Sequence, residues 1–512
     1  AQFNASTTTF DNATQVTAVA PKASFLNAQE PYKIKFVSSS GLAGSSATGL
    51  INVDSAPTWT TASGNLATIS DQDTGTHATL SATDPDGDTV TYSETGGTNI
   101  TGAGLSLNSS TGVISGDPTD VNASTTVSFT GRATAGSKTT DRAFNIIIDP
   151  YRDVYFGILG AGGGGGGRQS TSYQGSLDVM GRGGAGSFVE AVYAIKLGTT
   201  IYTYVGHYGQ SGQSGSAGGA VNAYGGNGRG GGNEDTSGEG GDFSGIFTAN
   251  SVTQANALII AGGGGGGGFT AQGTGGTGRP HGAGGNNDAM CNGGGQITDT
   301  STGAGNDGTR GNNSPTHSHG SNRGGQGGQQ NGGGAAGTAS GSNNNAQNGS
   351  ALQGGNGSSA SGWGNGGGGG GGFFGGGGGG DDHVNWGGQG GGAGSSFVRG
   401  GLTNYSTSAF NSVTATGITY VSHTFRAQSW GYGGGTTNNN TNANVMYQTY
   451  DFSSFGSGYG TNGKGGRENS SYPAAGSDGG HGLVFYRIGN SGSYTRLTST
   501  NTSGTLSSLT IS

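Results

Sequence analysis

The sequence predicts an all-β protein in which a β-sandwich precedes a glycine-rich domain of β-strands and packed glycine helices. Three observations carry this prediction. Short runs of alternating apolar and polar residues recur about every ten residues between positions 56 and 149. Glycine accounts for 120 of the 512 residues, whereas proline accounts for only 9. Two strand-like runs, "DVYFGILG" and "ALIIA", lead directly into oligoglycine, which indicates that strands and glycine runs form one structure.

The composition is that of an ordered chain with a small aliphatic core. Only 29% of the residues are hydrophobic and 9% are charged. Disordered chains are usually rich in charge and poor in aromatic residues. This chain instead has 19 Tyr, 19 Phe and 4 Trp, so we expect most of it to fold.

Charge and cysteine content narrow the classes of function. The net charge is −8 without a basic block, which argues against nucleic acid and anionic membranes as partners. A single cysteine allows neither a disulfide framework nor a cysteine-based zinc site. No apolar run is long enough to insert into a membrane, and the first residues lack the pattern of a signal peptide. We expect either a removed signal or release from the cell inside a particle.

Four segments differ in composition. Residues 1–55 are rich in Ser, Thr, Ala and Asn, contain one alternating stretch at Tyr32–Ser40, and are interpreted as an attachment segment. Residues 56–149 contain about seven short alternating runs separated by turn signals such as "DPDGD". Residues 150–489 hold the oligoglycine, and residues 490–512 form a polar tail that is an edge strand, a docking segment or the start of a further element.

Residues 56–149 resemble a known family of Ig-like domains. The stretch "ATDPDGDTVTYS" and the later "GLSLNSSTGVISG" are similar to the cadherin-like, or putative Ig, domains of bacterial and phage proteins. The resemblance covers nearly the whole segment and implies an Ig-like β-sandwich. It also implies a spacer or a weak glycan-binding module.

The oligoglycine is interpreted as scaffold. Ordering each backbone residue costs about 1–2 kcal/mol, with glycine at the upper end, so an ordered run needs compensating contacts. The sequence has no Gly-X-Y period, which excludes collagen, and glycine's poor β propensity disfavours stacked strands. The polyproline II conformation remains: without Cβ atoms, such helices can lie side by side and pair N–H with C=O groups.

Residues 150–489 resemble a second family, the glycine-rich domains that combine β-sandwich strands with polyglycine II helices. The motifs are "LIIAGGGGGGG" and "WGNGGGGGGGFFGGGGG". The family includes phage tail-fibre adhesins and the glycine-rich module of the anaplastic lymphoma kinase receptor. This chain lacks that receptor's cysteines, kinase domain and membrane segment, so the resemblance implies adhesion rather than signalling.

One acidic turn is a candidate metal site. Asp84, Asp86 and Asp88 alternate around Gly87, and oxygen ligands at this spacing suit Ca²⁺. The similarity to an EF-hand loop ends after five residues, without the acidic residue at the twelfth position. An ordinary solvated β-turn is the alternative, and no other cofactor is expected.

Aromatic residues set among Gly, Ser and Asn are the candidates for recognition, because rigid aromatic rings and small polar side chains together form versatile binding loops. The segment 429–460 is the preferred recognition surface. The alternative is that the aromatic residues cover the glycine helices, and this is favoured for Trp363, Phe373 and Phe374. The candidates are Trp386, Trp430, Tyr432, Tyr447, Tyr450, Phe452 and Tyr459.

The sequence thus predicts a non-enzymatic virion protein, a phage tail-fibre or fibre-tip adhesin. Neither a catalytic constellation nor a phosphate-binding motif is present. The expected partners are a host-surface glycan or protein, or other virion proteins, with multiple copies per particle. Two alternatives remain: a capsid decoration or surface-filament protein without a receptor, and a secreted adhesin on a bacterial surface.

Overall fold

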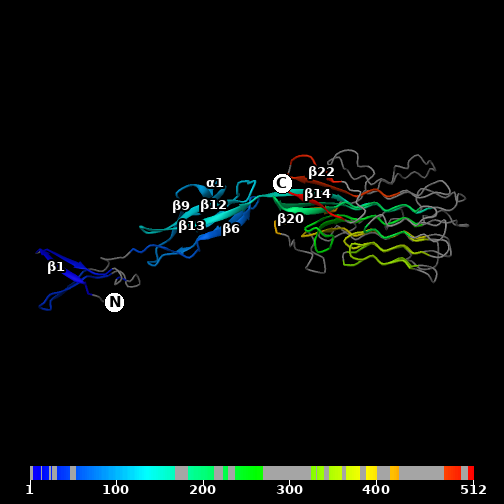
Figure 1. Ribbon diagram of the computed structural model, residues 1–512. Coiled ribbons are helices and arrows are strands. Elements are labelled where there is room, and N and C mark those ends of the chain that lie inside the picture. Colours follow the sequence, from blue (N-terminus) through cyan, green and yellow to red (C-terminus); the bar gives the residue numbers. More distant parts are fainter. Residues whose placement is uncertain are drawn as a thin grey trace, which may run out of the picture. The chain divides into compact units, whose positions relative to one another are not determined.

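The computed structural model is almost entirely β and divides into two units, residues 1–151 and 152–512. Each unit is described by itself (Figure 1). The structure describes residues 4–12, 14–21, 25, 32–46, 54–167, 183–212, 223–228, 237–268, 324–329, 331–338, 345–359, 365–380, 388–400, 416–425, 478–489, 491–497 and 505–512.

The first unit begins with two hairpins. Strand β1 (Thr7–Asn12) pairs with β2 (Gln15–Val19), and β3 (Lys35–Val37) pairs with β4 (Ala43–Ser45), each as a separate two-stranded sheet. The stretch Tyr32–Ser40, for which a strand is predicted, therefore contains a strand of only three residues.

A β-sandwich follows the hairpins, as the sequence predicts. One sheet has the order β6-β13-β12-β9, a second has β10-β11-β7, and the short strands β5 and β8 pair separately. The bounds are β5 Thr58–Trp59, β6 Gly64–Ser70, β7 Gly75–Thr79, β8 Ala82–Thr83, β9 Thr91–Thr95, β10 Leu105–Leu107, β11 Val113–Gly116, β12 Thr125–Ala135 and β13 Lys138–Asp149. A single helical turn, α1 (Asn99–Gly102), precedes β10. Trp59 lies in the core with its ring centroid 5.1 Å from that of Phe144.

The second unit contains two five-stranded sheets. Their orders are β20-β15-β14-β21-β22 and β19-β18-β17-β16-β23. The bounds are β14 Tyr151–Leu159, β15 Phe188–Lys196, β16 Thr200–Tyr204, β17 Ser244–Phe247, β18 Ala257–Ala261, β19 Phe397–Val398, β20 Ile418–Phe425, β21 Leu483–Ile488, β22 Thr495–Leu497 and β23 Ser507–Thr510. The polar C-terminal segment thus supplies an edge strand, β23, and buries Ile511.

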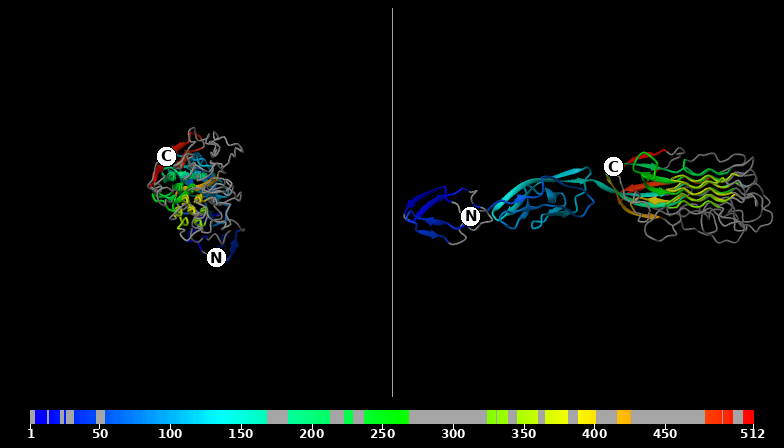
Figure 2. Two further views of the ribbon diagram at one scale, coloured as in Figure 1. Left: turned by 90° about the vertical axis from the view of Figure 1, so that its right-hand side faces the viewer. Right: turned by 90° about the horizontal axis from the view of Figure 1, so that it is seen from below.

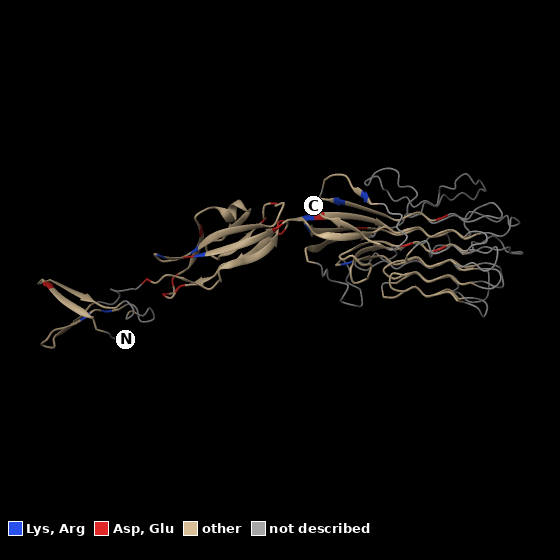
Figure 3. Cartoon of the chain, viewed as in Figure 1, with Lys and Arg blue, Asp and Glu red and all other residues tan. Residues whose placement is uncertain are grey.

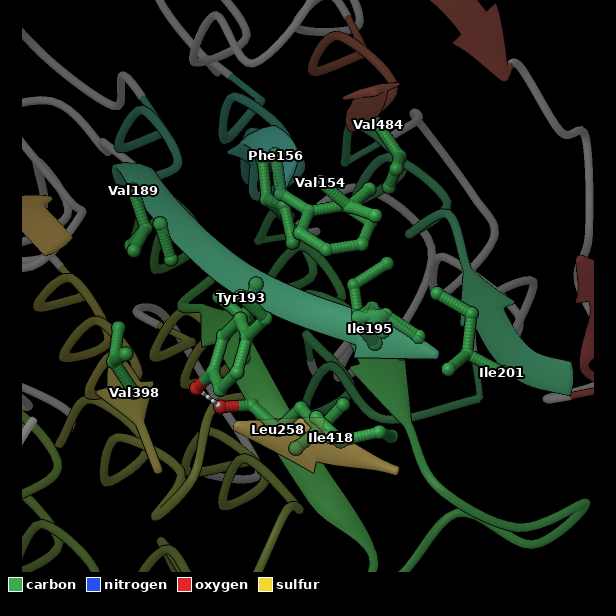
Figure 4. Close-up of a cluster of buried hydrophobic side chains, with 14 of the residues drawn as sticks. Val154, Phe156, Val189, Tyr193, Ile195, Ile201, Leu258, Val398, Ile418 and Val484 are labelled. Carbon is green, nitrogen blue, oxygen red and sulfur yellow. Dashed lines mark hydrogen bonds between the residues drawn. The ribbon is translucent and has the colours of Figure 1, made fainter. Parts of the chain in front are cut away.

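Aliphatic side chains from both sheets form the core of this unit (Figure 4). The cluster includes Val154 and Phe156 of β14, Ile195 of β15 and Leu258 of β18. The Tyr193 hydroxyl, also buried, donates to the carbonyls of Leu258 at 3.1 Å and Arg399 at 2.6 Å. Burial raises the pKa of Tyr193 far above its ordinary value, so the hydroxyl remains a donor that ties one sheet to the other.

Glycine runs continue from the strands as a hydrogen-bonded slab, defined here as the described glycine-rich residues between 160 and 396 together with 478–482. Figure 2 shows these runs lying side by side beyond the ends of the strands. The run 365–372 is representative, because its N–H groups donate to three neighbouring runs in rotation. Gly366, Gly367 and Gly368 donate to Ser358, Gln389 and Gly238, and Gly369, Gly370 and Gly371 donate to Gly355, Gly392 and Gly241.

This rotation identifies the backbone conformation. Residues three apart donate to the same neighbouring run, which is the periodicity of polyproline II, with three residues per turn. Carbonyls of run 365–372 accept from three further runs, for example Gly226 N–H to the Gly369 oxygen at 2.7 Å. The run is therefore hydrogen bonded on all sides, and the fold class predicted from the sequence is confirmed.

Inside the slab many positions must be glycine, because the neighbouring backbone leaves no room for a Cβ atom. A Cβ on Gly368 would lie 1.8 Å from the Gly226 oxygen, and one on Gly369 would lie 2.0 Å from the Gly376 oxygen. Cβ atoms in proteins essentially never approach other heavy atoms closer than 3.0 Å. Some larger residues lie at partly exposed positions, where Asn356 donates from its amide to the Gln347 side chain at 2.8 Å, and others such as Gln389 are buried.

Candidate recognition surface

The predicted recognition residues lie outside the described part of the chain. Residues 381–387 and 426–477 contain all of them, so the structure neither places nor excludes Trp386, Trp430, Tyr432, Tyr447, Tyr450, Phe452 and Tyr459. The described residues do show where these segments are attached.

Segment 426–477 joins the second unit at two fixed points. At its start, Phe425 ends β20 and pairs with Val189 of β15. At its end, Asp478 accepts hydrogen bonds from the backbone N–H and hydroxyl of Ser211, at 2.8 and 3.0 Å. Gly479 then donates to the Gly209 carbonyl at 3.0 Å and enters the slab. Both attachment points are therefore part of the rigid scaffold.

The far ends of the glycine runs gather at the side of the slab opposite the strands. Runs 160–167 and 262–268 leave β14 and β18 directly, and run 388–396 leads back into β19. At their far ends, Gly267 donates to the Gly164 carbonyl and Gly238 donates to Gly267, at 2.9 and 2.8 Å. Five segments outside the description connect runs at this end: 168–182, 229–236, 269–323, 360–364 and 381–387. Segment 213–222 leads from Gly212 at this end to Ala223 at the base of the slab. Figure 3 shows few charged residues along the described runs.

A cluster of three aromatic rings lies where run 478–482, which follows segment 426–477, packs against run 205–212. The ring centroids of His207 and Tyr208 are 4.1 Å apart, and His481 lies 4.8 Å from the first and 4.7 Å from the second. The Tyr208 hydroxyl is hydrogen bonded to Asp478, and burial is the main cause that raises the pKa of Tyr208. The cluster therefore fastens the C-terminal anchor of the segment to run 205–212.

A buried carboxylate organises the base of the slab. Asp242 is fully buried, and its oxygens accept from the N–H groups of Tyr224 at 2.7 Å and Gly225 at 2.8 Å. The Ala223 N–H and the Tyr204 hydroxyl also donate to it. Burial raises the pKa of Asp242, whereas these hydrogen bonds oppose that shift. Sequence reasoning missed this residue, because "GEGGDFSG" contains no pattern that marks a buried acid.

The two phenylalanines between the longest glycine runs are packing residues. Phe373 is fully buried, and its ring stacks on Phe397 of β19 with centroids 4.0 Å apart. Phe374 packs partly buried against the same cluster, as does Tyr224. These rings join the slab to the sheet β19-β18-β17-β16-β23, which agrees with the interpretation of Phe373 and Phe374 as covers of the glycine helices. Trp363 lies outside the described residues.

The predicted calcium turn contains a fourth aspartate that sequence spacing could not reveal. Asp84 accepts from the N–H groups of Asp86 and Asp88 at 3.0 and 3.2 Å, an arrangement typical of an ordinary turn. Asp54 reaches the same place: a Cβ on Gly136 would lie 2.9 Å from Asp88 Oδ2 and 3.5 Å from Asp54 Oδ1.

The geometry of this turn is compatible with a calcium site and with an ordinary β-turn. Three carboxylate oxygens, Asp54 Oδ1, Asp84 Oδ2 and Asp86 Oδ1, are shielded from solvent without a hydrogen-bond partner. Within the described ranges, however, no three acidic, His or Cys side chains converge as a preformed metal site. Calcium at Asp84, Asp86 and Asp88 therefore stays a prediction, to which the structure adds Asp54 as a fourth candidate ligand.

Calcium is expected to raise the melting temperature of the first unit, since a cation would offset the cost of burying these carboxylate oxygens. Calorimetry of the full chain with calcium and then with excess chelator measures the effect. Asp84→Asn should abolish it, whereas Asp141→Asn, which alters an exposed ion pair with Arg132, should leave it unchanged. An identical melting temperature with calcium and chelator would leave the turn as an ordinary one.

The second unit is expected to lose stability as the pH falls below about 6.5, the ordinary histidine value. Burial, with the charge of His207, lowers the pKa of His481, and burial lowers that of His423. The unfolded chain therefore binds protons that the folded chain does not, so the free energy of unfolding rises with pH through this window. Urea titrations between pH 5 and 7.5 test this, and His481→Gln should flatten the dependence. An unchanged slope in this variant would contradict the assignment.

Comparison with known proteins identifies the class of domain formed by the β-sandwich of the first unit. The family model described as "Putative Ig domain" matches residues 57–149, the region of the sandwich β5–β13. Sandwiches of this architecture are widespread in cell-surface proteins, in adhesive and structural roles. No curated protein matches the chain.

Several solved structures align with the chain over part of its length. Human protocadherin-24 EC1-2 is 18% identical, with 29% of this chain and 66% of that chain covered and a TM-score of 0.19. Mouse cadherin-23 EC22-24 is 14% identical, with 42% and 67% covered and a TM-score of 0.18. An endo-fucoidan hydrolase of glycoside hydrolase family 107 is 15% identical, with 48% and 35% covered and a TM-score of 0.16. The chain thus spans about two thirds of the first structure.

Within the described part of the chain, no helix has the length and apolar character needed to cross a bilayer.

Proposed function

We propose that this protein is a non-enzymatic adhesin that acts outside the cell, and more narrowly a phage fibre-tip adhesin. The Ig-like module acts as a spacer, and the glycine slab presents recognition segments to a host-surface glycan or protein. Multiple copies on one particle would add avidity to modest individual contacts.

One observation carries the proposal: a slab held by backbone hydrogen bonds has its far ends joined to segments of very different length and composition. Because hydrogen bonds of the runs come from main-chain groups, the slab does not depend on the side chains of the attached segments. Segment 426–477, which holds six of the seven candidate aromatic residues, is fixed at both ends through Phe425 and Asp478. A scaffold of this kind suits a surface whose partner changes over time.

Replacement of residues 429–460 by a Gly/Ser linker of equal length tests the proposal in the full chain. We expect adsorption to host cells to fall at least tenfold while the melting temperature stays the same. The matched control replaces residues 402–414, which also lie outside the described residues but connect β19 to β20 at the strand side. Undiminished adsorption of the 429–460 variant would remove this segment as the recognition surface.

Antibody labelling of purified particles separates the proposed role from its rivals. Label at fibre tips is the expected result. Label spread along a capsid lattice or filament would support a decoration protein without a receptor, and label on bacterial cells without particles would support a secreted adhesin.

A further inference from the structure

The slab has a solvent-facing border formed by two neighbouring runs, residues 333–338 and 345–350, called here the outer runs. Gly349 of the second run donates to the Gly334 carbonyl of the first at 2.8 Å. Every fully exposed residue of the outer runs carries a side chain, whereas their glycines are buried or half-buried. The exposed residues are Ala335, Thr338, Asn345, Gln347, Asn348 and Ser350.

Some backbone donors of the outer runs have no run to pair with. Gly334 and Gly337 donate into the slab, to run 375–380, at 2.9 and 2.8 Å. Other N–H groups on the exposed side donate to no protein group in the described part of the chain. They are those of Ala335, Asn345 and Asn348. The edge strand of a β-sheet has unpaired groups of this kind, and they make it a template for pairing with another chain.

The side chains at this border occupy the space that a further run would need. Neighbouring runs of the slab lie too close for a Cβ atom: one on Gly333 would lie 1.9 Å from the Gly349 oxygen. A further run could therefore pack at the same distance only against glycine. Ala335, Asn345 and Asn348 instead carry a Cβ on the same residue as the unpaired N–H group.

Hydrogen bonds hold two of these side chains close to the border. Asn348 accepts from the Ala336 N–H group at 2.8 Å, and Asn345 accepts from the Ser359 N–H group at 2.7 Å. Neither outer run contains a charged residue, so repulsion between like charges does not keep two such borders apart. Steric exclusion by side chains is the means that the sequence provides.

We propose that the outer runs cap the slab: their exposed side chains prevent this border from joining the same border of a second copy through backbone hydrogen bonds. A second copy is the partner to be excluded, because its border has the same period of three residues per turn and the same unpaired groups. Such a contact would be isologous and would close as a dimer. Capping matters most where many copies crowd on one particle, but it does not depend on what the protein recognises.

Replacing the caps by glycine in the full chain tests this inference. We expect the glycine variant to associate at a protein concentration at least tenfold lower than the unchanged chain, as measured by light scattering. The matched control has serine at the same positions, so that it loses the same side-chain hydrogen bonds but keeps each Cβ, and it should associate like the unchanged chain. The glycine variant combines Ala335→Gly, Thr338→Gly, Asn345→Gly, Gln347→Gly, Asn348→Gly and Ser350→Gly.

Amide hydrogen exchange distinguishes pairing of the borders from aggregation of a damaged fold. In the associated glycine variant the N–H groups at positions 335, 345 and 348 should exchange more slowly than in the unchanged chain, because they gain acceptors. Fast exchange at these positions in the associated variant would overturn the proposal. Equal association of the serine control, or a folded glycine variant that associates no more than the unchanged chain, would also overturn it.

A smaller change keeps the test decisive if the full glycine variant fails to fold. Ala335→Gly with Thr338→Gly leaves the hydrogen bonds of Asn345 and Asn348 in place. This variant should associate at least threefold more readily than Ala335→Ser with Thr338→Ser. Equal association of the two double variants would contradict capping.

Discussion

Gly369→Ala is expected to lower the stability of the second unit by more than about 4 kcal/mol, the range reached by severe overpacking. The added Cβ would lie 2.0 Å from the Gly376 oxygen, and Gly369 is hydrogen bonded through both its N–H and its carbonyl. Neighbouring backbone cannot move aside without breaking the hydrogen bonds of several runs. Calorimetry of the full chain should show the transition of the second unit at a much lower temperature, with that of the Ig-like module unchanged.

Gly332→Ala provides the control within the same slab. A Cβ there would meet nothing within 4 Å, and the backbone is not in the left-handed region. Alanine should be neutral or stabilise by about 0.4–1 kcal/mol, because it restricts the unfolded chain. Equal losses at both positions would show that side-chain clash is not what requires glycine.

Asp242→Ala is expected to destabilise the second unit by about 3–5 kcal/mol, because several buried donors lose their shared acceptor. The N–H groups of Tyr224 and Gly225 and the Tyr204 hydroxyl would be left without it. Tyr204→Phe, which removes only one of these donors, should cost about 1–2 kcal/mol. Urea unfolding of the three proteins measures the series. A loss in the alanine variant no larger than that of Tyr204→Phe would mean that Asp242 is not the organising group.

The local elements were largely predictable from the sequence, but their assembly was not. Alternation in "TVSFTGRAT" and "FVEAVYAIK" indicates β12 and β15 because one side of each strand is buried. Likewise, the absence of Gly-X-Y periodicity in runs such as 366–372 leaves polyproline II as the ordered conformation. The identity of neighbouring runs could not be predicted, since identical glycines carry no information about register.

The candidate sites were likewise only partly predictable from the sequence. Asp84, Asp86 and Asp88 are visible from spacing, whereas Asp54 joins them only through the fold. Asp242 and His481 are single polar residues among glycines, and only the packing of distant runs makes them a buried anchor and a ring cluster. Phe373 is surrounded by glycine, as several of the candidate recognition residues are, and it stacks on Phe397 in the core. Glycine-rich sequence context alone therefore does not identify an aromatic residue as a recognition residue.

Successive N–H groups of run 365–372 point to three different neighbouring runs, and this constrains how the glycine runs can change in length. Removing one glycine would turn every later N–H by a third of a revolution, so that each would point toward the wrong neighbour. Removing three would shift the remainder by one complete turn and restore every direction. Insertions and deletions inside the slab should therefore be tolerated as triplets, whereas the segments joined to its far ends are free to gain or lose residues one at a time.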